Sequence, residues 1–287
     1  MSEIINYIPY LGNKKWYVDK IIHKIGLKNK YLHFVEPFAG SGVVSLNISA
    51  RFNDVDIILN ELDLNIYKIH KSFKYGNFEQ FNSIINEIYS FGDPKENKED
   101  YYTARNELNK KYFKEEFSIK QGFYYYAICT FAINSMVRFG PNGFNQGWGH
   151  RGIGKLNNLV KFNKNEFDKI NSLYKPITLY NEDYKNILEK VNNKSFIFLD
   201  PPYSNKQSGT YSFTYDDHKE FINVIKNLNN KILYTDVFSQ ETLEMLGNNW
   251  NCILLRENLG KAKPGKTKAI TKEALYFNFN INTNSLF

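Results

Sequence analysis

Asp200-Pro201-Pro202-Tyr203 follows directly after the apolar run 195–199. Two prolines cannot continue a central strand, so we expect the chain to leave a sheet at this point. The turn would expose the Asp200 carboxylate, the Pro201 carbonyl and the face of the Tyr203 ring. Two acceptors beside an aromatic ring suit a planar group that carries an NH2. A rigid turn with a solvated carboxylate is the alternative interpretation.

A second candidate is the turn Glu36-Pro37-Phe38-Ala39-Gly40-Ser41-Gly42, which ends the apolar run 32–38. Glycines between a strand and a helix permit positive φ and let a ligand approach the backbone closely. Glu61 ends the next predicted strand about 20 residues after Gly40, where an acceptor for ribose hydroxyls belongs. The spacing is not GxGxxG, so a dinucleotide is not favoured. An ordinary tight turn is an equally good interpretation of the glycines alone.

Hydrophobic periodicity indicates the elements that position these motifs. Apolar runs predict strands at 32–38, 56–61, 177–179, 195–199, 231–235, 252–255 and 274–279. Helical spacing falls between them, at 43–52, 62–73, 218–228 and 240–246. This alternation predicts an α/β fold with a doubly wound parallel sheet. Ligands of such sheets bind at the carboxyl ends of the strands, where both motifs lie.

The stretch from Gly42 to Asp200 is longer than the intervening strand–helix steps need, at roughly 30 residues a step. We therefore expect an inserted, mainly helical domain at residues 69–174 within a domain made of residues 1–68 and 175–287. Helices are predicted at 101–112 and 122–137, before a loop rich in Gly, Asn and Arg.

Composition restricts the class of protein. The chain has 287 residues, of which 42% are hydrophobic and 16% aromatic, and this excludes wholesale disorder. Its net charge of +7 is compatible with a nucleic-acid partner. Cys129 and Cys252 cannot build a disulfide framework or a four-thiolate metal site. The five histidines show no ligand spacing and suit surface or packing positions, with His150 a candidate phosphate contact, so no metal is expected. A polar N-terminus and the lack of a run of about 18 apolar residues predict no membrane span and a cytoplasmic protein.

Taken together, the motifs resemble the Dam-type, D12-class DNA adenine-N6 methyltransferases, over nearly the whole chain and in the same order. Tyr10-Leu11-Gly12-Asn13-Lys14 is similar to the N-terminal cofactor motif, usually Trp-Ala-Gly-Gly-Lys. Phe38-Ala39-Gly40-Ser41-Gly42 matches FxGxG, and Asn60-Glu61-Leu62-Asp63 resembles the second-strand motif, which more often has Asp in place of Glu61. Asp200-Pro201-Pro202-Tyr203 matches the catalytic tetrapeptide.

Two further runs carry the resemblance. Asn134-Ser135-Met136-Val137-Arg138-Phe139, followed by Gly143-Phe144-Asn145, resembles the family's DNA-reading loop. Glu273-Ala274-Leu275-Tyr276-Phe277-Asn278 resembles its last strand. The tetrapeptide and the DNA-reading run are specific, whereas the cofactor motifs occur in many methyltransferases. Tyr10 for Trp and Asn13 for Gly depart from the pattern but still leave a stacking ring and a lysine.

The resemblance implies an enzyme that uses S-adenosylmethionine. It would have a Rossmann-like sheet and an inserted target-recognition domain. It implies methyl transfer to N6 of an adenine flipped out of double-stranded DNA. Catalysis would be carried out by Asp200, Pro201, Pro202 and Tyr203. Asp200 and the Pro201 carbonyl would accept hydrogen bonds from the two N6–H groups, and Tyr203 would stack on the base. The resemblance assigns the cofactor site to Tyr10, Lys14, Glu36, Pro37, Phe38, Gly40, Gly42, Glu61, Asp183, Tyr184 and Asp200.

DNA binding is assigned to polar and basic residues of the predicted insert and to a lysine-rich run near the C-terminus: Asn134, Met136, Arg138, Asn145, Arg151, Lys155, Lys261, Lys263, Lys266 and Lys268. We expect a monomer in the cytoplasm of a bacterium or in a phage-infected cell, with a cognate restriction endonuclease encoded separately. Two alternatives stay open. One is an RNA or protein-glutamine methyltransferase, although the amide-directed enzymes typically carry Asn-Pro-Pro-Tyr. The other is a catalytically inactive DNA-binding relative.

Overall fold

A computed structural model describes residues 5–8, 14, 18–25, 33–52, 54–113, 118–133, 137–149, 162–202, 213–259 and 270–280. In this part of the chain, seven strands form one sheet in the order β5-β2-β1-β6-β7-β9-β8. The strands are β1 (His33–Glu36), β2 (Asp56–Asn60), β5 (Ile177–Tyr180), β6 (Ser195–Leu199), β7 (Lys231–Val237), β8 (Asn251–Leu259) and β9 (Ile270–Phe277).

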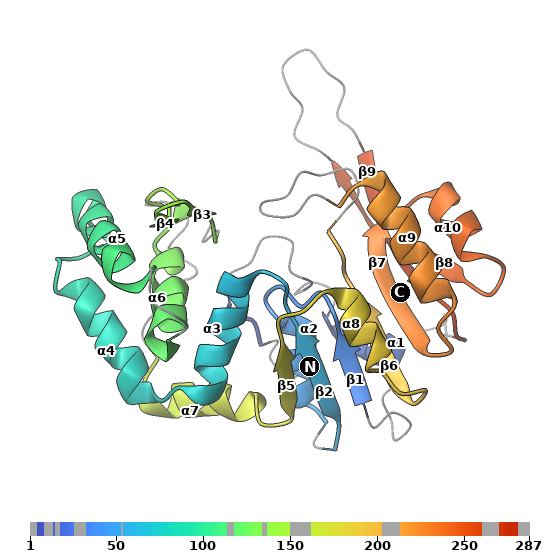
Figure 1. The fold of residues 1–287 in the computed structure, drawn as a ribbon, viewed down its shortest axis with the longest axis horizontal. Helices are drawn as coiled ribbons and strands as arrows, with labels where there is room; N and C mark the ends of the chain where they lie inside the picture. The colour runs from blue at the N-terminus through green and yellow to red at the C-terminus, as the bar shows by residue number, and fades with distance from the viewer. Residues whose placement is uncertain are drawn as a thin grey trace, which may run out of the picture. The chain divides into compact units, whose positions relative to one another are not determined.

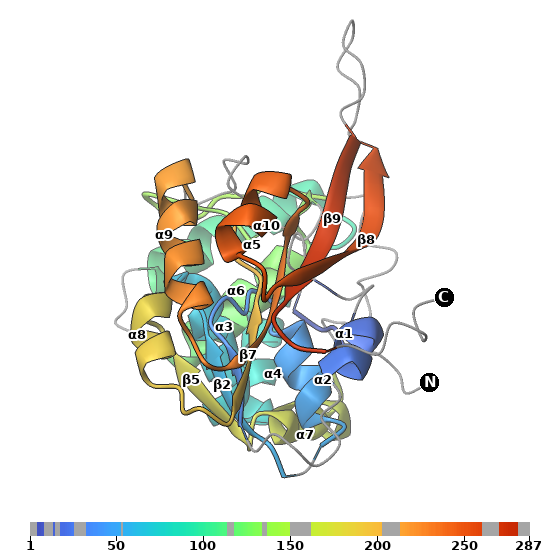
Figure 2. The same cartoon turned by 90° about the vertical axis from the view of Figure 1, so that its right-hand side faces the viewer.

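The central strands of this sheet are parallel. β6 pairs in parallel with β1 and with β7, so that Leu199 lies opposite Tyr234. β9 runs antiparallel to both β7 and β8, and Figure 2 shows β8 and β9 side by side. The mixed, mostly parallel sheet confirms the predicted α/β class.

Ten helices are described within these ranges: α1 (Val18–Ile25), α2 (Val43–Ser49), α3 (Leu64–Tyr75), α4 (Phe78–Tyr89), α5 (Lys98–Tyr112), α6 (Ile119–Thr130), α7 (Lys164–Leu173), α8 (Tyr184–Glu189), α9 (Tyr215–Lys226) and α10 (Gln240–Leu246). Side-chain caps fix several of their starts. The helix predicted from residue 62 begins at Leu64 because the Asp63 carboxylate accepts a hydrogen bond from the Asn65 N–H at 2.9 Å.

The chain divides into two compact units. Unit 1 comprises Met1–Asp19, Ala39–Asn53 and Leu59–Asn181, and unit 2 comprises Lys20–Phe38, Asp54–Ile58 and Glu182–Phe287. Residues 69–174, the predicted insert, all fall in unit 1.

Aromatic packing builds the core of unit 1. α3 lies along α6, with α4 and α5 against α6 and α7 against α3 (Figure 1). Between these helices, Phe81 contacts Phe123 and Phe167 with ring centroids 5.4 and 5.7 Å apart. Phe73 lies 5.5 Å from Phe123 in an edge-on arrangement. Much of the high aromatic content therefore serves the core.

The helix predicted at 122–137 is too long, because α6 ends at Thr130. Beyond it the backbone bonds to a later segment: the Gly149 N–H donates to the Phe131 carbonyl at 3.0 Å, and Ala132 forms a bridge with Trp148. A Cβ on Gly149 would lie 2.7 Å from the Ala132 backbone, so glycine permits this approach. The apolar spacing continued past Thr130, but long-range pairing replaces the helical hydrogen bonds.

Candidate active site

The glycine turn lies between β1 and α2. Gly40 and Gly42 have φ of 51° and 65°. A Cβ at Gly42 would lie 2.8 Å from Cε1 of His70, so both the backbone conformation and the packing require glycine there. The Gly42 N–H donates to the Ala39 carbonyl at 2.8 Å, and the Gly42 carbonyl accepts from the Leu46 N–H at 2.9 Å. The turn therefore leads directly into the first turn of α2.

Glu61 holds this turn from the end of β2. Its Oε2 accepts from the Gly40 N–H at 2.7 Å, and its Oε1 accepts from the Asp63 N–H at 2.8 Å. Burial raises the pKa of Glu61 to about 7, although the two backbone N–H groups act in the opposite direction. The structure thus brings together Gly40 and Glu61, two residues that the sequence assigned to one site. Each carboxylate oxygen retains capacity for a second hydrogen bond.

The Gly40 carbonyl also forms a hydrogen bond with a buried side chain. Nε2 of His70, on α3, lies 2.8 Å from this oxygen. Sequence reasoning treated the histidines as surface or packing residues and gave His70 no part in the glycine turn. Its spacing of 30 residues from Gly40 has no motif that would have indicated the contact.

In unit 2, Asp200 follows the last residue of β6 and is half-buried. The Thr235 hydroxyl on the neighbouring strand β7 donates to Asp200 Oδ1 at 2.7 Å and also lies 3.3 Å from the Leu199 carbonyl. Thr235 is itself 1% exposed. A charge-assisted hydrogen bond from a buried hydroxyl fixes one carboxylate oxygen at the carboxyl end of the sheet. The sequence singled out Asp200 but not Thr235.

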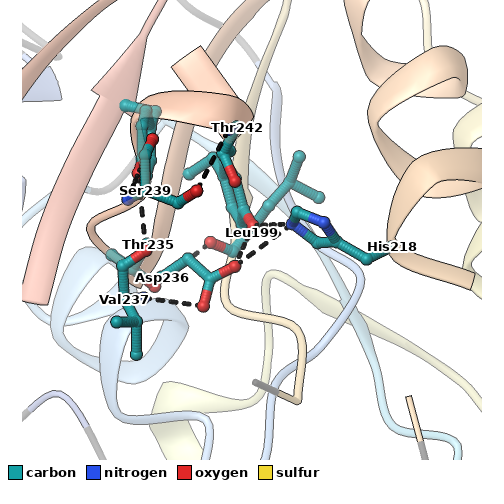
Figure 3. A network of polar contacts seen from close by, with 9 residues as sticks. Leu199, His218, Thr235, Asp236, Val237, Ser239 and Thr242 are labelled. Carbon is teal, nitrogen blue, oxygen red and sulfur yellow. Dashed lines mark hydrogen bonds and ion pairs between the residues drawn. The ribbon is translucent and has the colours of Figure 1, made fainter. Parts of the chain in front are cut away.

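A second polar cluster holds the end of β7 against α9 (Figure 3). Oδ2 of Asp236 accepts a short hydrogen bond from the Tyr234 hydroxyl and lies 3.3 Å from Nε2 of His218, while Oδ1 accepts from the Val237 N–H at 2.6 Å. The Ser239 N–H beyond the strand donates to the Tyr276 hydroxyl at 2.8 Å. Most of these groups are buried, and they bond to one another. β7 is therefore fixed at Tyr234 and at Asp236, the residues on either side of Thr235.

Two of the other predicted cofactor residues of unit 2, Phe38 and Tyr184, lie side by side. The Phe38 ring is 5.2 Å from that of Tyr184, and both contact Phe221. Glu36, at the end of β1, is buried. Asp183 is exposed and caps α8 by accepting from the Lys185 N–H at 2.9 Å.

A two-stranded hairpin presents the predicted DNA-reading residues. β3 (Phe139–Gly140) pairs with β4 (Gly143–Phe144), and the Asn145 N–H donates to the Arg138 carbonyl at 3.0 Å. The side chains of Arg138 and Asn145 are exposed. Phe139 anchors the hairpin on α6, with its ring 4.7 Å from that of Tyr125. The expected loop is therefore a hairpin with two polar residues side by side at its base.

Comparison with known proteins identifies the family. Residues 10–261 match the family model of D12 class N6 adenine-specific DNA methyltransferases. The chain belongs to this family. The methyltransferase is also similar to the Type II methyltransferase M.MjaIII of Methanocaldococcus jannaschii, with 24% identity over 228 residues that cover 76% of each chain. The predicted enzyme class, a DNA methyltransferase directed at adenine N6, is confirmed, and with it the need for a methyl donor and a DNA substrate.

Several predicted site residues of the methyltransferase lie outside the described residues: Tyr10, Asn134, Met136, His150, Arg151, Lys155, Tyr203, Lys261, Lys263, Lys266 and Lys268. Lys14 is described and buried. Pro201 is buried and Pro202 half-buried. Among the described helices of the methyltransferase, none is long and apolar enough to cross a membrane.

Proposed function

We propose that the methyltransferase transfers the methyl group of S-adenosylmethionine to N6 of an adenine flipped out of double-stranded DNA. The observation that carries this proposal is the Asp200 carboxylate, held at the end of β6 by the Thr235 hydroxyl at 2.7 Å and followed by Pro201. A fixed carboxylate next to a backbone carbonyl provides two acceptors for one amino group.

These acceptors account for activation of the adenine. Asp200 and the Pro201 carbonyl accept hydrogen bonds from the two N6–H groups, which raises electron density on the nitrogen, and Tyr203 stacks on the base. The carboxylate then stabilises the positive charge that develops on N6 as the N–C bond forms and the S–C bond breaks. The S–C electron pair stays on the donor sulfur, and the proton that N6 then loses passes to Asp200. S-Adenosylmethionine, when bound, supplies a methyl group on a sulfonium leaving group. Positioning therefore matters more than covalent help from the protein.

The glycine turn of unit 1 suits a methyl donor that carries hydroxyl groups. Ser41 Oγ is buried, and none of the described residues bonds to it, so it can bond to a ligand of this turn. We assign Gly40, Gly42 and Glu61 to the donor, with the Glu61 carboxylate accepting from the ribose. Tyr10 and Lys14 would bind it from the N-terminal motif, and the remaining donor contacts are assigned to Glu36, Pro37, Phe38, Asp183, Tyr184 and Asp200.

Residues 69–174 are proposed to form the target-recognition domain, in which Arg138 and Asn145 contact base edges. Asn134, Met136, Arg151 and Lys155 would contribute further DNA contacts. The lysines at 261, 263, 266 and 268 are proposed to bind phosphates. A role in restriction–modification agrees with the name of the relative, a Type II methyltransferase.

Replacement of the acceptor tests the proposal. Asp200→Asn and Asp200→Ala should each reduce tritiated methyl incorporation into double-stranded DNA by a factor of roughly 100 or more, while donor binding by calorimetry persists in weakened form. Asp216, exposed in the first turn of α9, gives a matched control, and Asp216→Asn should behave like the wild type. Wild-type turnover in Asp200→Ala would remove Asp200 from catalysis. Preferential methylation of an RNA of the same sequence would favour the RNA alternative.

A further inference from the structure

A buried chain of hydrogen bonds links the N-terminal segment to the glycine turn of unit 1. Nε2 of His70 bonds to the Gly40 carbonyl at 2.8 Å, and Nδ1 of His70 bonds to the Tyr174 hydroxyl at 2.9 Å. The Tyr7 hydroxyl in turn donates to that of Tyr174 in a short hydrogen bond. His70 and Tyr174 are 0% exposed and Tyr7 is 4% exposed, so water does not compete with these bonds.

The Gly40 carbonyl, at one end of this series of hydrogen bonds, determines which atom donates in each of them. A carbonyl oxygen only accepts, so Nε2 of His70 carries the proton. Burial lowers the pKa of His70 to about 4, and the imidazole is therefore neutral at pH 7. Nδ1 must then accept from Tyr174, whose oxygen accepts from Tyr7. These partners thus assign one tautomer to His70 and one direction to each hydrogen bond of the series.

The same turn is fixed from two further directions. Glu61 accepts the Gly40 N–H at 2.7 Å, so both backbone polar groups of Gly40 are bonded to buried side chains. A Cβ on Gly42 would lie only 2.8 Å from Cε1 of the His70 ring. His70 therefore determines the position of the Gly40 carbonyl and the space available beside Gly42.

The N-terminal segment is docked on the helix that follows the turn. Asn47 on α2 accepts from the Ile5 N–H at 3.0 Å and donates to the Ile5 carbonyl at 2.7 Å. Tyr7 packs edge-on against Phe73, with ring centroids 5.0 Å apart. This segment leads into the predicted cofactor motif that begins at Tyr10. Tyr174, between His70 and Tyr7 in this series of bonds, follows α7, and its carbonyl accepts from Lys74 Nζ at 3.0 Å.

We infer that His70, held by Tyr174 and Tyr7, is a positioning residue that sets the glycine turn in the conformation that binds the methyl donor. This inference rests on the proposed function of that turn. It assigns to three residues of separate segments a role that neither motif spacing nor resemblance indicated. A purely structural role would predict the same donor affinity in any variant that folds.

Two replacements of His70 in the full-length protein distinguish a positioning role from a purely structural one. Glutamine can place an N–H donor near Nε2, whereas leucine cannot donate to the Gly40 carbonyl. We expect His70→Gln to bind S-adenosylhomocysteine within about threefold of the wild type and His70→Leu to bind it about tenfold more weakly or worse, by calorimetry. Tyr174→Phe should give an intermediate loss. His33→Leu, on β1, is the control and should leave the affinity unchanged.

DNA binding in the absence of donor, measured by fluorescence anisotropy, should stay within about twofold for every variant that remains folded. A folded His70→Leu variant with wild-type donor affinity would overturn the inference. Failure of the wild type itself to bind S-adenosylhomocysteine would instead contradict the proposed donor site, so the two failures are distinguishable.

A measurement on the unaltered protein covers the case in which His70→Leu does not fold. Nitrogen-15 spectra of the imidazoles should show His70, assigned by its absence from the His70→Gln spectrum, as the neutral Nε2–H tautomer from pH 8 to about 5. Its Nε2 resonance should shift when S-adenosylhomocysteine is added. Ordinary titration near pH 6.5, or no change on ligand addition, would contradict the inference.

Discussion

The side-chain amide of Asn109 bonds to both backbone polar groups of Phe144. Its Nδ2 donates to the Phe144 carbonyl at 2.8 Å, and its Oδ1 accepts from the Phe144 N–H at 3.1 Å. The Tyr124 hydroxyl donates to the same Oδ1 at 3.0 Å. Gly143 has φ +106°, and a Cβ on it would lie 2.6 Å from Oδ1. Asn109 thus pairs with β4 as a neighbouring strand would, and it attaches the hairpin to α5.

This attachment predicts that Asn109 affects DNA specificity without touching DNA. Asn109→Leu leaves the Phe144 N–H and carbonyl unpaired in a buried site, at a cost of about 1–3 kcal/mol. We expect the hairpin to shift and methylation across a panel of single-base site variants to become less selective, while donor affinity is unchanged. Lys110→Ala, at an exposed position on the same helix, should keep the wild-type profile. A wild-type profile in Asn109→Leu would contradict this role.

Arg138 tests the same hairpin directly. An arginine that bonds O6 and N7 of a guanine contributes roughly 1–3 kcal/mol of discrimination at one base pair. We therefore expect Arg138→Ala to relax the preference at one position of the methylation site. Neutralising Lys261, Lys263, Lys266 and Lys268 should instead weaken binding equally on all sequences and make its salt dependence shallower. An unchanged preference profile together with a shallower salt dependence in Arg138→Ala would show that this residue binds phosphate.

Local patterns predicted the sheet well. β6 and α10 have the predicted bounds, 195–199 and 240–246, because each is an apolar pattern ended by residues that cannot extend it. α4 and α7 were not predicted, although both carry a readable signal. Capping boxes begin at Asn77 and Asn163, ahead of apolar residues at helical spacing.

The sequence also predicted candidate motif residues for the site, but it did not indicate the residues that hold them in place. Gly40 and Glu61 share a motif spacing and do bond to each other. Thr235, His70 and Asn109 each act on a residue at least 30 positions away. Those contacts depend on which strands and helices become neighbours. The two-residue strands β3 and β4 are likewise too short to show a period of two.

Glu61 predicts a pH dependence of donor binding. Burial raises its pKa from an ordinary value of 4.5 to about 7, so a substantial fraction is protonated at neutral pH. A carboxylate that accepts from ribose hydroxyls binds better when charged, and donor affinity should therefore increase as the pH rises from 6 through about 7 to 8. Glu61→Gln should bind more weakly and without this dependence. Calorimetric titration across the range measures both, and a flat wild-type curve would mean that the ribose is bound elsewhere.

The sign of the stability effect follows from the same shift. A carboxyl whose pKa is higher in the folded state than in the unfolded state contributes stability below pH 4.5, and this contribution is lost as the pH rises through about 7. The free energy of unfolding of Glu61→Gln should therefore increase relative to that of the wild type between pH 5 and pH 8. Urea unfolding at both pH values provides the comparison.

Thr235 provides the sharpest test of how Asp200 is held. Its buried hydroxyl donates to Asp200 Oδ1 at 2.7 Å, and hydrogen bonds to charged groups contribute about 1.5–3 kcal/mol. Thr235→Val keeps the shape of the side chain but removes the donor. If this bond aligns the carboxylate with the adenine amino group, single-turnover methylation should slow by a factor of roughly 10 to 100. The affinity for the methyl donor should change by no more than about twofold, because the variant keeps the Asp200 carboxylate and Asp200 is only one of several groups assigned to that ligand. Thr235→Ser restores the hydroxyl and should recover most of the rate, whereas a general loss of packing would leave Ser as slow as Val. A Thr235→Val enzyme with the wild-type single-turnover rate would show that Asp200 reaches its working position without this bond.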